Sequence, residues 1–393
     1  MGWSHRIASA LSFVERRVDR WRYGKQWHIR RKRPIRIEAY RGYAGAERAL
    51  VMARILDNPP LARAGRTDSA WKNLLSMLRR LETDELPHAR VEIEFPDGAV
   101  HQAMADEEGH VRAWLPAARA FDPARSWHDV AIRIQPTRIT ARPHSQFSGI
   151  VRVLTAPASA RFGIVSDIDD TVIRTDATSV TAMLRGTLLG NAHTRIAFAG
   201  GAELYRALHA GARGNEANPF FYVSSSPWNL YDVLEHVFEL HGLPEGPLLL
   251  RNWGISDQEL LPTGHRLHKL ETIAHILETF PALPFVLIGD SGQEDPEIYD
   301  EIVRRHGERI RAVYIRNVTP AESRAADIRA LGDRIREAGS VLILADDSHA
   351  AAEHAAEHGL IDPQHLPAIY EKIRQEKEPG ERAPTVIVEG EAS

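Results

Sequence analysis

Three aspartates follow an apolar run near the middle of the chain. The segment GIVSDIDDTV, residues 163–172, places Asp167, Asp169 and Asp170 within four residues. Carboxylates this close repel one another, and the arrangement is costly unless a cation or a shared proton relieves it. Asp167 and Asp169 are two residues apart, so both side chains can face one pocket. One alternative is that Asp169 or Asp170 caps the next segment, but this would explain one aspartate and not three. Because hard divalent cations prefer carboxylate oxygens, the sequence predicts a Mg2+ site.

Further polar residues follow other apolar runs. The segment SSSPW offers the Ser224 hydroxyl and neighbouring backbone N–H groups to a phosphoryl oxygen. Lys269 begins a predicted helix, from which its ammonium group can reach a phosphate and a carboxylate together. The segment IGDSGQED supplies Asp290 as a cation ligand and Asp295 as a supporting carboxylate. Taken singly, these are an ordinary serine-rich turn and a solvated lysine. Together they predict chemistry on a phosphomonoester.

Continuous apolar strands separated by helical patterns position these residues. The strands are FGIVSD, PFFYVS, PLLLRN, PFVLIGD, RAVYIRN and SVLILAD, within about residues 160–350. Buried strands that alternate with helices predict a Rossmann-like α/β domain with a parallel sheet covered on both faces. Ligands of such sheets bind beyond the carboxyl ends of the strands. Asp167, Ser224 and Asp290 lie at such ends and are expected to meet at one rim.

Residues 35–155 show the shorter period of half-buried strands. Mostly alternating runs occupy residues 35–40, 49–56, 89–95, 99–104, 110–115, 128–134 and 148–154, and a helix is expected at about 69–82. Seven short strands at this spacing predict an all-β sandwich domain. No cluster of chemically active residues lies in this region, so we expect it to bind or scaffold.

The N-terminal segment, residues 1–34, is basic and amphipathic. Residues 1–36 carry a net charge of +9 and leave −13 on the rest of the chain. An apolar stripe predicts a helix that lies on an anionic membrane or packs against the protein itself or a partner; its members are Trp3, Ile7, Leu11, Val14, Val18 and Trp21. Contact with RNA or DNA is a third use of a basic arm, but no nucleic-acid partner is expected. At the other end, residues 372–393 are rich in Glu, Lys and Pro and are predicted to form a flexible tail.

Composition excludes several classes of protein. The chain has no cysteine, which rules out disulfides, zinc–thiolate sites and thiol catalysis. It has neither a long apolar run nor a secretory signal, so we expect a cytoplasmic protein, peripheral to the inner face of the membrane. The H-x-x-E-H pattern of His354 and His358 and the GDSG of residues 289–292 are interpreted as chance likenesses to zinc and serine proteases. The sequence makes no prediction of oligomeric state.

The motifs resemble those of a known superfamily. DIDDT, the strand-end serine, the lysine and GDSGQED are similar to the four motifs of haloacid-dehalogenase-type phosphatases. More narrowly, SDIDDTV, YVSSSPWNLY, PTGHRLHK and IGDSGQEDPEIY resemble the phosphatidate phosphatases of the fungal actin-patch protein type. YRGYAGAERALVMARIL and TDELPHARVEIEF resemble the β-rich region of that family, so the likeness covers about residues 35–360. It implies a catalytic domain at 160–371, after the sandwich at 35–155.

The resemblance also implies a role for each site residue. Asp167 would be the nucleophile that forms an aspartyl-phosphate, and Asp169 the general acid and base. Ser224, Ser225 and Lys269 would hold the phosphoryl group, and the Thr171 hydroxyl would stabilise the loop. Mg2+ would be bound by Asp167, Asp290 and the main-chain carbonyl of Asp169, with Asp295 behind them.

The predicted activity is hydrolysis of phosphatidate to diacylglycerol and phosphate. Two alternatives remain open at this stage. One is the same chemistry on a soluble phosphomonoester. The other is a membrane or scaffold adaptor whose phosphatase domain has lost its activity, which the intact set Asp167, Asp169, Ser224 and Lys269 disfavours.

Overall fold

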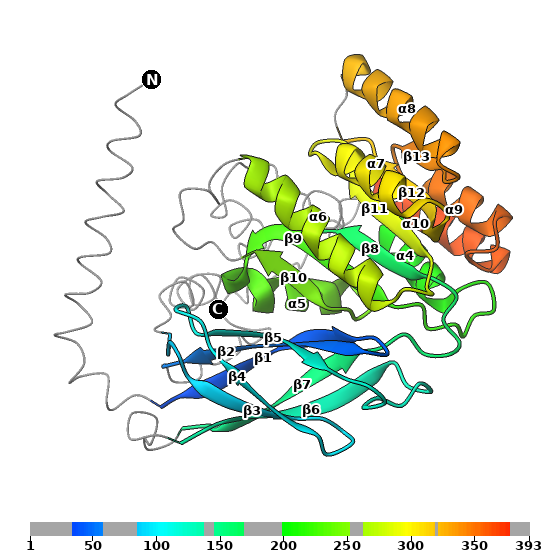
Figure 1. Ribbon diagram of the computed structural model, residues 1–393. Coiled ribbons are helices and arrows are strands. Elements are labelled where there is room, and N and C mark those ends of the chain that lie inside the picture. The colour runs from blue at the N-terminus through cyan, green and yellow to red at the C-terminus, as the bar shows by residue number, and fades with distance from the viewer. Residues whose placement is uncertain are drawn as a thin grey trace, which may run out of the picture.

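A computed structural model describes six stretches of the chain: residues 34–57, 85–136, 145–168, 199–251, 262–318 and 321–377. The predicted helices at the N-terminus and at about 69–82 lie outside them. The described residues build two sheets, an N-terminal one of seven strands and a C-terminal one of six strands with helices around it (Figure 1). We call these parts the β domain and the α/β domain.

The six-stranded sheet confirms the predicted parallel α/β architecture. Its strands are β8 (Gly163–Asp167), β9 (Phe220–Pro227), β10 (Leu248–Arg251), β11 (Phe285–Asp290), β12 (Ile310–Arg316) and β13 (Leu342–Ala345). They run in the order β10-β9-β8-β11-β12-β13, and every neighbouring pair is parallel. The strand order therefore reverses between β8 and β11, which is where doubly wound sheets bind their ligands.

The described part of the α/β domain has seven helices, and six of them fall into two groups. Their bounds are α4 (Gly201–Ala210), α5 (Tyr231–His241), α6 (Pro262–Thr279), α7 (Asp295–His306), α8 (Glu322–Glu337), α9 (Ser348–Glu357) and α10 (Leu366–Lys377). Helices α6, α7 and α8 pack in a row, and α4, α9 and α10 pack on one another. By the rule that parallel crossovers are right-handed, the two groups are expected on opposite faces of the sheet, which explains why its strands are apolar throughout.

All seven predicted strands of the β domain form. They are β1 (Arg36–Ala44), β2 (Arg48–Leu56), β3 (Arg90–Glu94), β4 (Val100–Met104), β5 (His110–Pro116), β6 (Trp127–Ile134) and β7 (Ser148–Leu154). The all-β character is thus confirmed, but the strands form one sheet in the order β4-β3-β6-β7-β1-β2-β5 rather than two separate ones. One half of this sheet consists of β4, β3, β6 and β7, and the other half consists of β1, β2 and β5. The two halves are joined because β1 and β7 pair in parallel at Gly42↔Val153 and Tyr43↔Leu154. Both halves still contribute to one shared core, as the halves of a sandwich do.

A β-bulge in β1 turns two tyrosines toward the α/β domain. Tyr40 pairs with Met52 and Tyr43 pairs with Leu50, so between these pairs two residues of β1 oppose one residue of β2. Residues three apart on a regular strand face opposite sides, and the extra residue places both tyrosines on the same side. Gly42 is required at the bulge, since a Cβ atom there would lie 2.1 Å from the carbonyl oxygen of Leu50.

The two domains share a hydrophobic core. Tyr43 lies 5.4 Å, ring centroid to ring centroid, from Phe221 of β9, in an edge-to-face arrangement. Tyr40 stacks on Trp228, which follows β9, with 4.8 Å between the ring centroids. On β2, Leu50 and Met52 join the same cluster while the alternate residues face the core of the β domain. Both faces of β2 are therefore buried, which explains its nearly continuous apolar sequence.

The C-terminal helix extends into the segment that the sequence predicts to be a flexible tail. Residues 372–377 of the predicted tail belong to α10, where the Glu376 carboxylate accepts a hydrogen bond from the Gly200 N–H at 2.8 Å. The rest of the tail lies outside the described residues.

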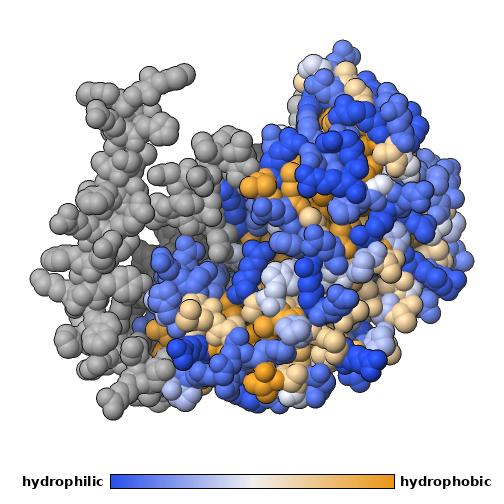
Figure 2. Space-filling model, in the orientation of Figure 1, coloured by the Kyte–Doolittle hydropathy of each residue, from blue (hydrophilic) through white to orange (hydrophobic). Residues whose placement is uncertain are grey.

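No helix in the described part of the chain has the length and apolar character needed to cross a membrane. On the face shown in Figure 2, hydrophilic residues cover most of the described surface, and apolar residues form small separate patches.

His110 of β5 makes the domain interface sensitive to acid. Its ring lies 5.8 Å from that of Trp228, and burial, with a smaller effect of the Arg54 charge, lowers the pKa of His110 to about 3. In the unfolded chain a histidine has a pKa of about 6.5. The folded state therefore excludes a proton that the unfolded chain binds. The contribution of neutral His110 to stability is complete above pH 6.5 and is lost as the pH falls toward 3.

We therefore expect His110→Phe to reduce the acid sensitivity of folding. Between pH 8 and pH 5, the wild-type protein should lose about 2 kcal/mol more of its free energy of unfolding than the variant. Urea titrations at the two pH values measure this difference, and the other histidines titrate alike in both proteins. Equal losses would show that His110 is protonated in the folded state at pH 5.

Candidate active site

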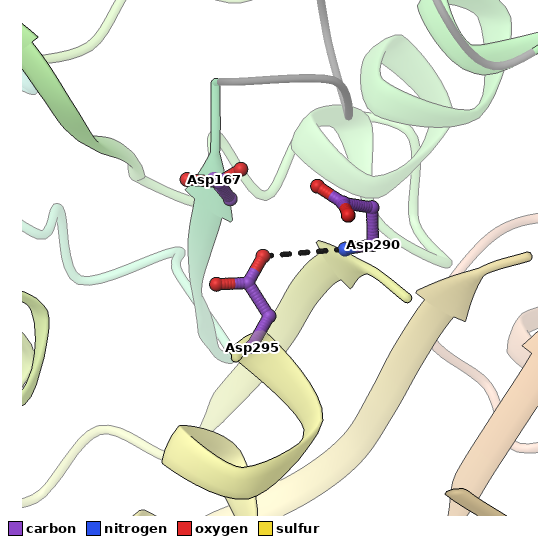
Figure 3. Close-up of side chains that lie close together, drawn as sticks. All are labelled: Asp167, Asp290 and Asp295. Atoms are coloured by element: carbon purple, nitrogen blue, oxygen red, sulfur yellow. Dashed lines mark hydrogen bonds between the residues drawn. The ribbon is translucent and has the colours of Figure 1, made fainter. Parts of the chain in front are cut away.

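Two aspartates face each other where the order of the strands reverses. Asp167 is the last residue of β8 and Asp290 is the last residue of β11. These neighbouring strands pair in parallel through Ile288↔Ser166, which brings both side chains to the same edge of the sheet. Asp295, the first residue of α7, approaches from the helix that follows β11 (Figure 3). Each of the three offers a carboxylate oxygen within 4.8 Å of those of the other two, and all three side chains are buried.

Lys269 of α6 lies among these carboxylates. Its Nζ atom is 2.7 Å from Oδ1 of Asp167 and 2.7 Å from Oδ1 of Asp295. The side chain is only 4% exposed, so water screens these ion pairs very little. The predicted reach of Lys269 to the carboxylate of Asp167 is therefore present in the structure. A single ammonium group offsets only part of the charge of three buried carboxylates.

The loop after β11 holds Asp290 and Asp295 in fixed positions. The Gly292 and Gln293 N–H groups donate to Oδ1 of Asp290, with N–O distances of 2.6 and 3.2 Å. The Asp290 N–H in turn donates to Oδ2 of Asp295 at 3.2 Å. A Cβ atom at Gly289 would lie 2.6 Å from that same oxygen, so the close approach of Asp295 requires a glycine in GDSG.

Arg324 of α8 fixes this loop from outside. Its Nε donates to the Ser291 carbonyl at 3.0 Å, its Nη2 donates to the Gln293 carbonyl at 2.7 Å, and the guanidinium pairs with Glu297. Arg324 carries no signal in the sequence, because it lies on a polar helix far along the chain and belongs to none of the motifs. Only the tertiary packing of α8 on α7 shows its role.

The serine segment, residues 224–228, starts beside Asp167. Asp167 pairs with Val223 of β9, so Ser224 is the next residue along the neighbouring strand. Ser224 is buried, and its Oγ accepts the Ser226 N–H at 2.9 Å. Ser225 is also buried. The structure thus brings Asp167, Ser224, Lys269, Asp290 and Asp295 together, as the sequence predicts.

His268 forms part of the same rim. Burial, together with the smaller effects of the positive charges of Arg112, Arg251 and Lys269, lowers the pKa of His268 to about 4. A contact with the Ser224 main chain opposes this effect. The imidazole is therefore neutral at pH 7 and adds no charge to the site.

The carboxylate cluster fits a hard divalent cation. Among the described residues it is the one group of three or more potential ligands, and its donors are carboxylate oxygens, as Mg2+ and Ca2+ prefer. The net negative charge left beside Lys269 supplies the driving force for binding. Asp169, Asp170 and Thr171 lie outside the described residues, so their predicted places at the site stay predictions.

The second metal-like motif has no such geometry. The rings of His354 and His358 stack with 4.0 Å between their centroids, and Nδ1 of His354 is 3.0 Å from the Tyr314 hydroxyl. Within the described stretches no third ligand joins this pair.

The segment that contains the site matches a known family of catalytic domains. Residues 162–317 match the family described as the catalytic domain of phosphatidate phosphatase APP1. This part of the chain is thus similar to the catalytic domain of phosphatidate phosphatase APP1. The match runs from β8 to the end of β12 and includes every predicted site residue. It does not include the β domain, for which the likeness to the family's N-terminal region stays a prediction.

Two curated proteins show the same similarity. The chain is 32% identical over 155 residues to phosphatidate phosphatase APP1 of Saccharomyces cerevisiae, which covers 39% of this chain and 25% of that protein. It is 30% identical over 158 residues to an uncharacterized protein of Schizosaccharomyces pombe, with the same two coverages. The matched segment thus spans about a quarter of the length of these relatives.

Among solved structures, the PilB minor pilin of Streptococcus sanguinis aligns over 74% of this chain and 88% of its own. The TM-score is 0.23 and the identity is 11%, so this likeness carries no argument about the fold.

We expect Mg2+ to stabilise the protein through the carboxylate cluster. Added Mg2+ should raise the melting temperature of the wild-type protein, because a ligand that binds only the folded state stabilises it by mass action. Asp290→Asn should remove this response. It should also leave the metal-free protein as stable as the wild type or more stable, since it relieves repulsion among the carboxylates.

Asp300→Asn is the matched control for this experiment. Asp300 is a buried carboxylate of α7 that pairs with Arg334 and lies outside the cluster. Thermal unfolding with EDTA and with increasing Mg2+ compares the three proteins. The same Mg2+ response in Asp290→Asn and in the wild type would exclude Asp290 as a ligand.

Proposed function

We propose that this protein is a Mg2+-dependent phosphatase of the haloacid-dehalogenase type that hydrolyses phosphatidate to diacylglycerol and phosphate. The observation that carries the proposal is the position of Asp167. Its carboxylate lies at a strand end, against the ammonium group of Lys269 and within reach of the Asp290 carboxylate. This arrangement occurs in the segment that matches the APP1 catalytic domain.

In the first step, an Asp167 oxygen attacks phosphorus and the bond from phosphorus to the glycerol oxygen breaks. The product is an aspartyl-phosphate, which divides one difficult displacement into two easier ones. Lys269 offsets the negative charge of Asp167 and can hold a phosphoryl oxygen at the same time. Ser224 and the backbone of the serine segment hold the other phosphoryl oxygens. Asp169 protonates the leaving alkoxide, since that oxygen cannot leave readily as an anion.

In the second step, Asp169 takes a proton from the water that attacks the aspartyl-phosphate, and free phosphate forms as Asp167 is released. Asp167 and Asp290, with the main-chain carbonyl of Asp169, would hold Mg2+, and Asp295 would support them through Lys269 and the Asp290 N–H. When bound, Mg2+ offsets the negative charge shared by the phosphoryl group and the carboxylates. The loop held by Arg324 fixes Asp290 and Asp295 before substrate arrives.

The choice of a lipid substrate rests on the family match and on the basic N-terminal segment. A segment with a net charge of +9 over residues 1–36 favours an anionic surface, at about 1 kcal/mol for each basic residue near it. We propose that residues 1–34 bind the inner face of the membrane and bring the site to phosphatidate there. The competing proposal is the same reaction on a soluble phosphomonoester.

Asp167→Asn should abolish phosphate release. The amide is a poor nucleophile, so we expect a loss on the order of a thousandfold or more in kcat. A malachite-green assay on phosphatidate in detergent micelles measures it, with circular dichroism to verify the fold. Asp300→Asn serves again as the control and should keep its activity. Substantial turnover by Asp167→Asn would exclude Asp167 as the nucleophile.

Deletion of residues 1–34 should separate the two substrate classes. If the segment binds membranes, the truncated protein should lose most of its activity on phosphatidate vesicles and keep its activity on p-nitrophenyl phosphate. Its binding to anionic vesicles in a sedimentation assay should fall in parallel, and high salt should weaken binding by the intact protein. Equal losses on both substrates would contradict membrane recruitment. A wild-type protein that hydrolyses only soluble esters would contradict phosphatidate as the substrate.

A further inference from the structure

We propose that the β domain positions the serine segment of the active site, and that Tyr40 is the positioning residue through which it acts. This inference rests on the proposed phosphatase function and assigns a role to a domain that lies outside the matched catalytic segment. On this proposal, the β domain and the α/β domain form one catalytic unit.

The contact is made within four residues of Ser224. Trp228 ends the serine segment, and its ring stacks on Tyr40 with 4.8 Å between centroids and 26° between planes. The ring centroid of Tyr231, at the start of α5, lies 4.4 Å from that of Tyr40. Tyr40 and Trp228 are 2% and 7% exposed, so the stack is sealed from water. Large rings packed in this way have few alternative positions, and the segment between Ser224 and Trp228 inherits that rigidity.

The β domain is built to present Tyr40 at this place. The bulge in β1 turns its ring toward the α/β domain, and its hydroxyl donates to Oε2 of Glu38 at 3.1 Å. His110 of β5 adds a second ring beside Trp228. Of the three described aromatic residues around Trp228, two therefore come from the β domain.

The same sheet also anchors the helix that carries Lys269. Arg48 of β2 donates from Nε to the Thr279 hydroxyl at 3.1 Å and from Nη2 to the His275 carbonyl at 3.1 Å, both on α6. Trp114 of β5 lies with its ring 5.7 Å from that of His275. Both phosphate-binding elements thus rest on the β domain. The strands that carry Asp167 and Asp290 are the two central strands of the parallel sheet.

Because the β domain contacts the phosphate-binding elements, a change in this contact should affect phosphate binding more than cation binding. Loss of the Tyr40 stack should weaken the binding of the phosphoryl group and leave cation binding by the carboxylate cluster intact. Small displacements of positioning groups can cost about a hundredfold in rate, so a tenfold or greater effect is expected. A general loss of folded protein would instead lower activity without raising KM for the molecules that remain folded.

The experiment compares four variants of the full chain. Tyr40→Ala removes the stack, Tyr40→Leu keeps apolar volume without it, and Tyr40→Phe keeps the ring but not the hydroxyl. Phe95→Ala is the matched control, because Phe95 is an aromatic residue, 3% exposed, in the core of the β domain away from the interface. Hydrogen exchange of residues 220–231, KM and kcat on micellar phosphatidate, and the Mg2+ shift in melting temperature are measured for each.

Tyr40→Ala and Tyr40→Leu should both exchange faster in residues 220–231 and raise KM about tenfold, with an unchanged Mg2+ shift. Tyr40→Phe should restore KM and exchange, and Phe95→Ala should leave both as in the wild type. If Tyr40→Ala does not fold, Tyr40→Leu decides. Unchanged exchange and KM in Tyr40→Leu would overturn the proposal, as would the same changes in Phe95→Ala. A wild-type protein without phosphatase activity would refute the proposed function and be recognised separately, because hydrogen exchange needs no substrate.

Discussion

The burial of three carboxylates around one lysine is the interaction on which the rest of the site depends. Lys269 pairs with Asp167 and Asp295, and a carboxylate oxygen of Asp290 lies within 4.8 Å of those of the two aspartates. Burying charges is expensive, and the pairing offsets only part of the cost. A protein keeps such an arrangement where a further cation completes it. The same excess of negative charge that a metal relieves also explains why backbone N–H groups of the loop after β11 are directed at Asp290.

The topology of the sheet decides where this cluster can form. β8 and β11 are neighbours at the place where the strand order reverses, and doubly wound sheets bind their ligands at such a place. Continuous apolar strands with helices on both faces give a rigid base, which lets short loops hold charged groups at fixed distances. The loop fixed by Arg324 shows that a helix outside the motifs takes part in this support.

The β domain extends the same support to the phosphate-binding side. Its sheet has two apolar faces, one that closes on its own core and one that packs on the α/β domain. Nothing in the alternation of β1 predicts that Tyr40 and Tyr43 face the same way, because the bulge at Gly42 changes the register. The prediction of two separate sheets was wrong for a related reason. Pairing between β1 and β7 involves strands far apart in sequence, and local patterns carry no signal for it.

The sequence by itself determined which segments are strands, which strands are fully buried, and which residues stand at their ends. Those features follow from local hydrophobic periodicity and from the types of Asp167, Ser224, Lys269 and Asp290, so they could be predicted. The tertiary structure alone decided that Lys269 bridges Asp167 and Asp295, that Arg324 holds the loop, and that the β domain packs against the serine segment. Contacts between residues distant in the chain depend on how whole elements pack, and packing is a property of the assembled core.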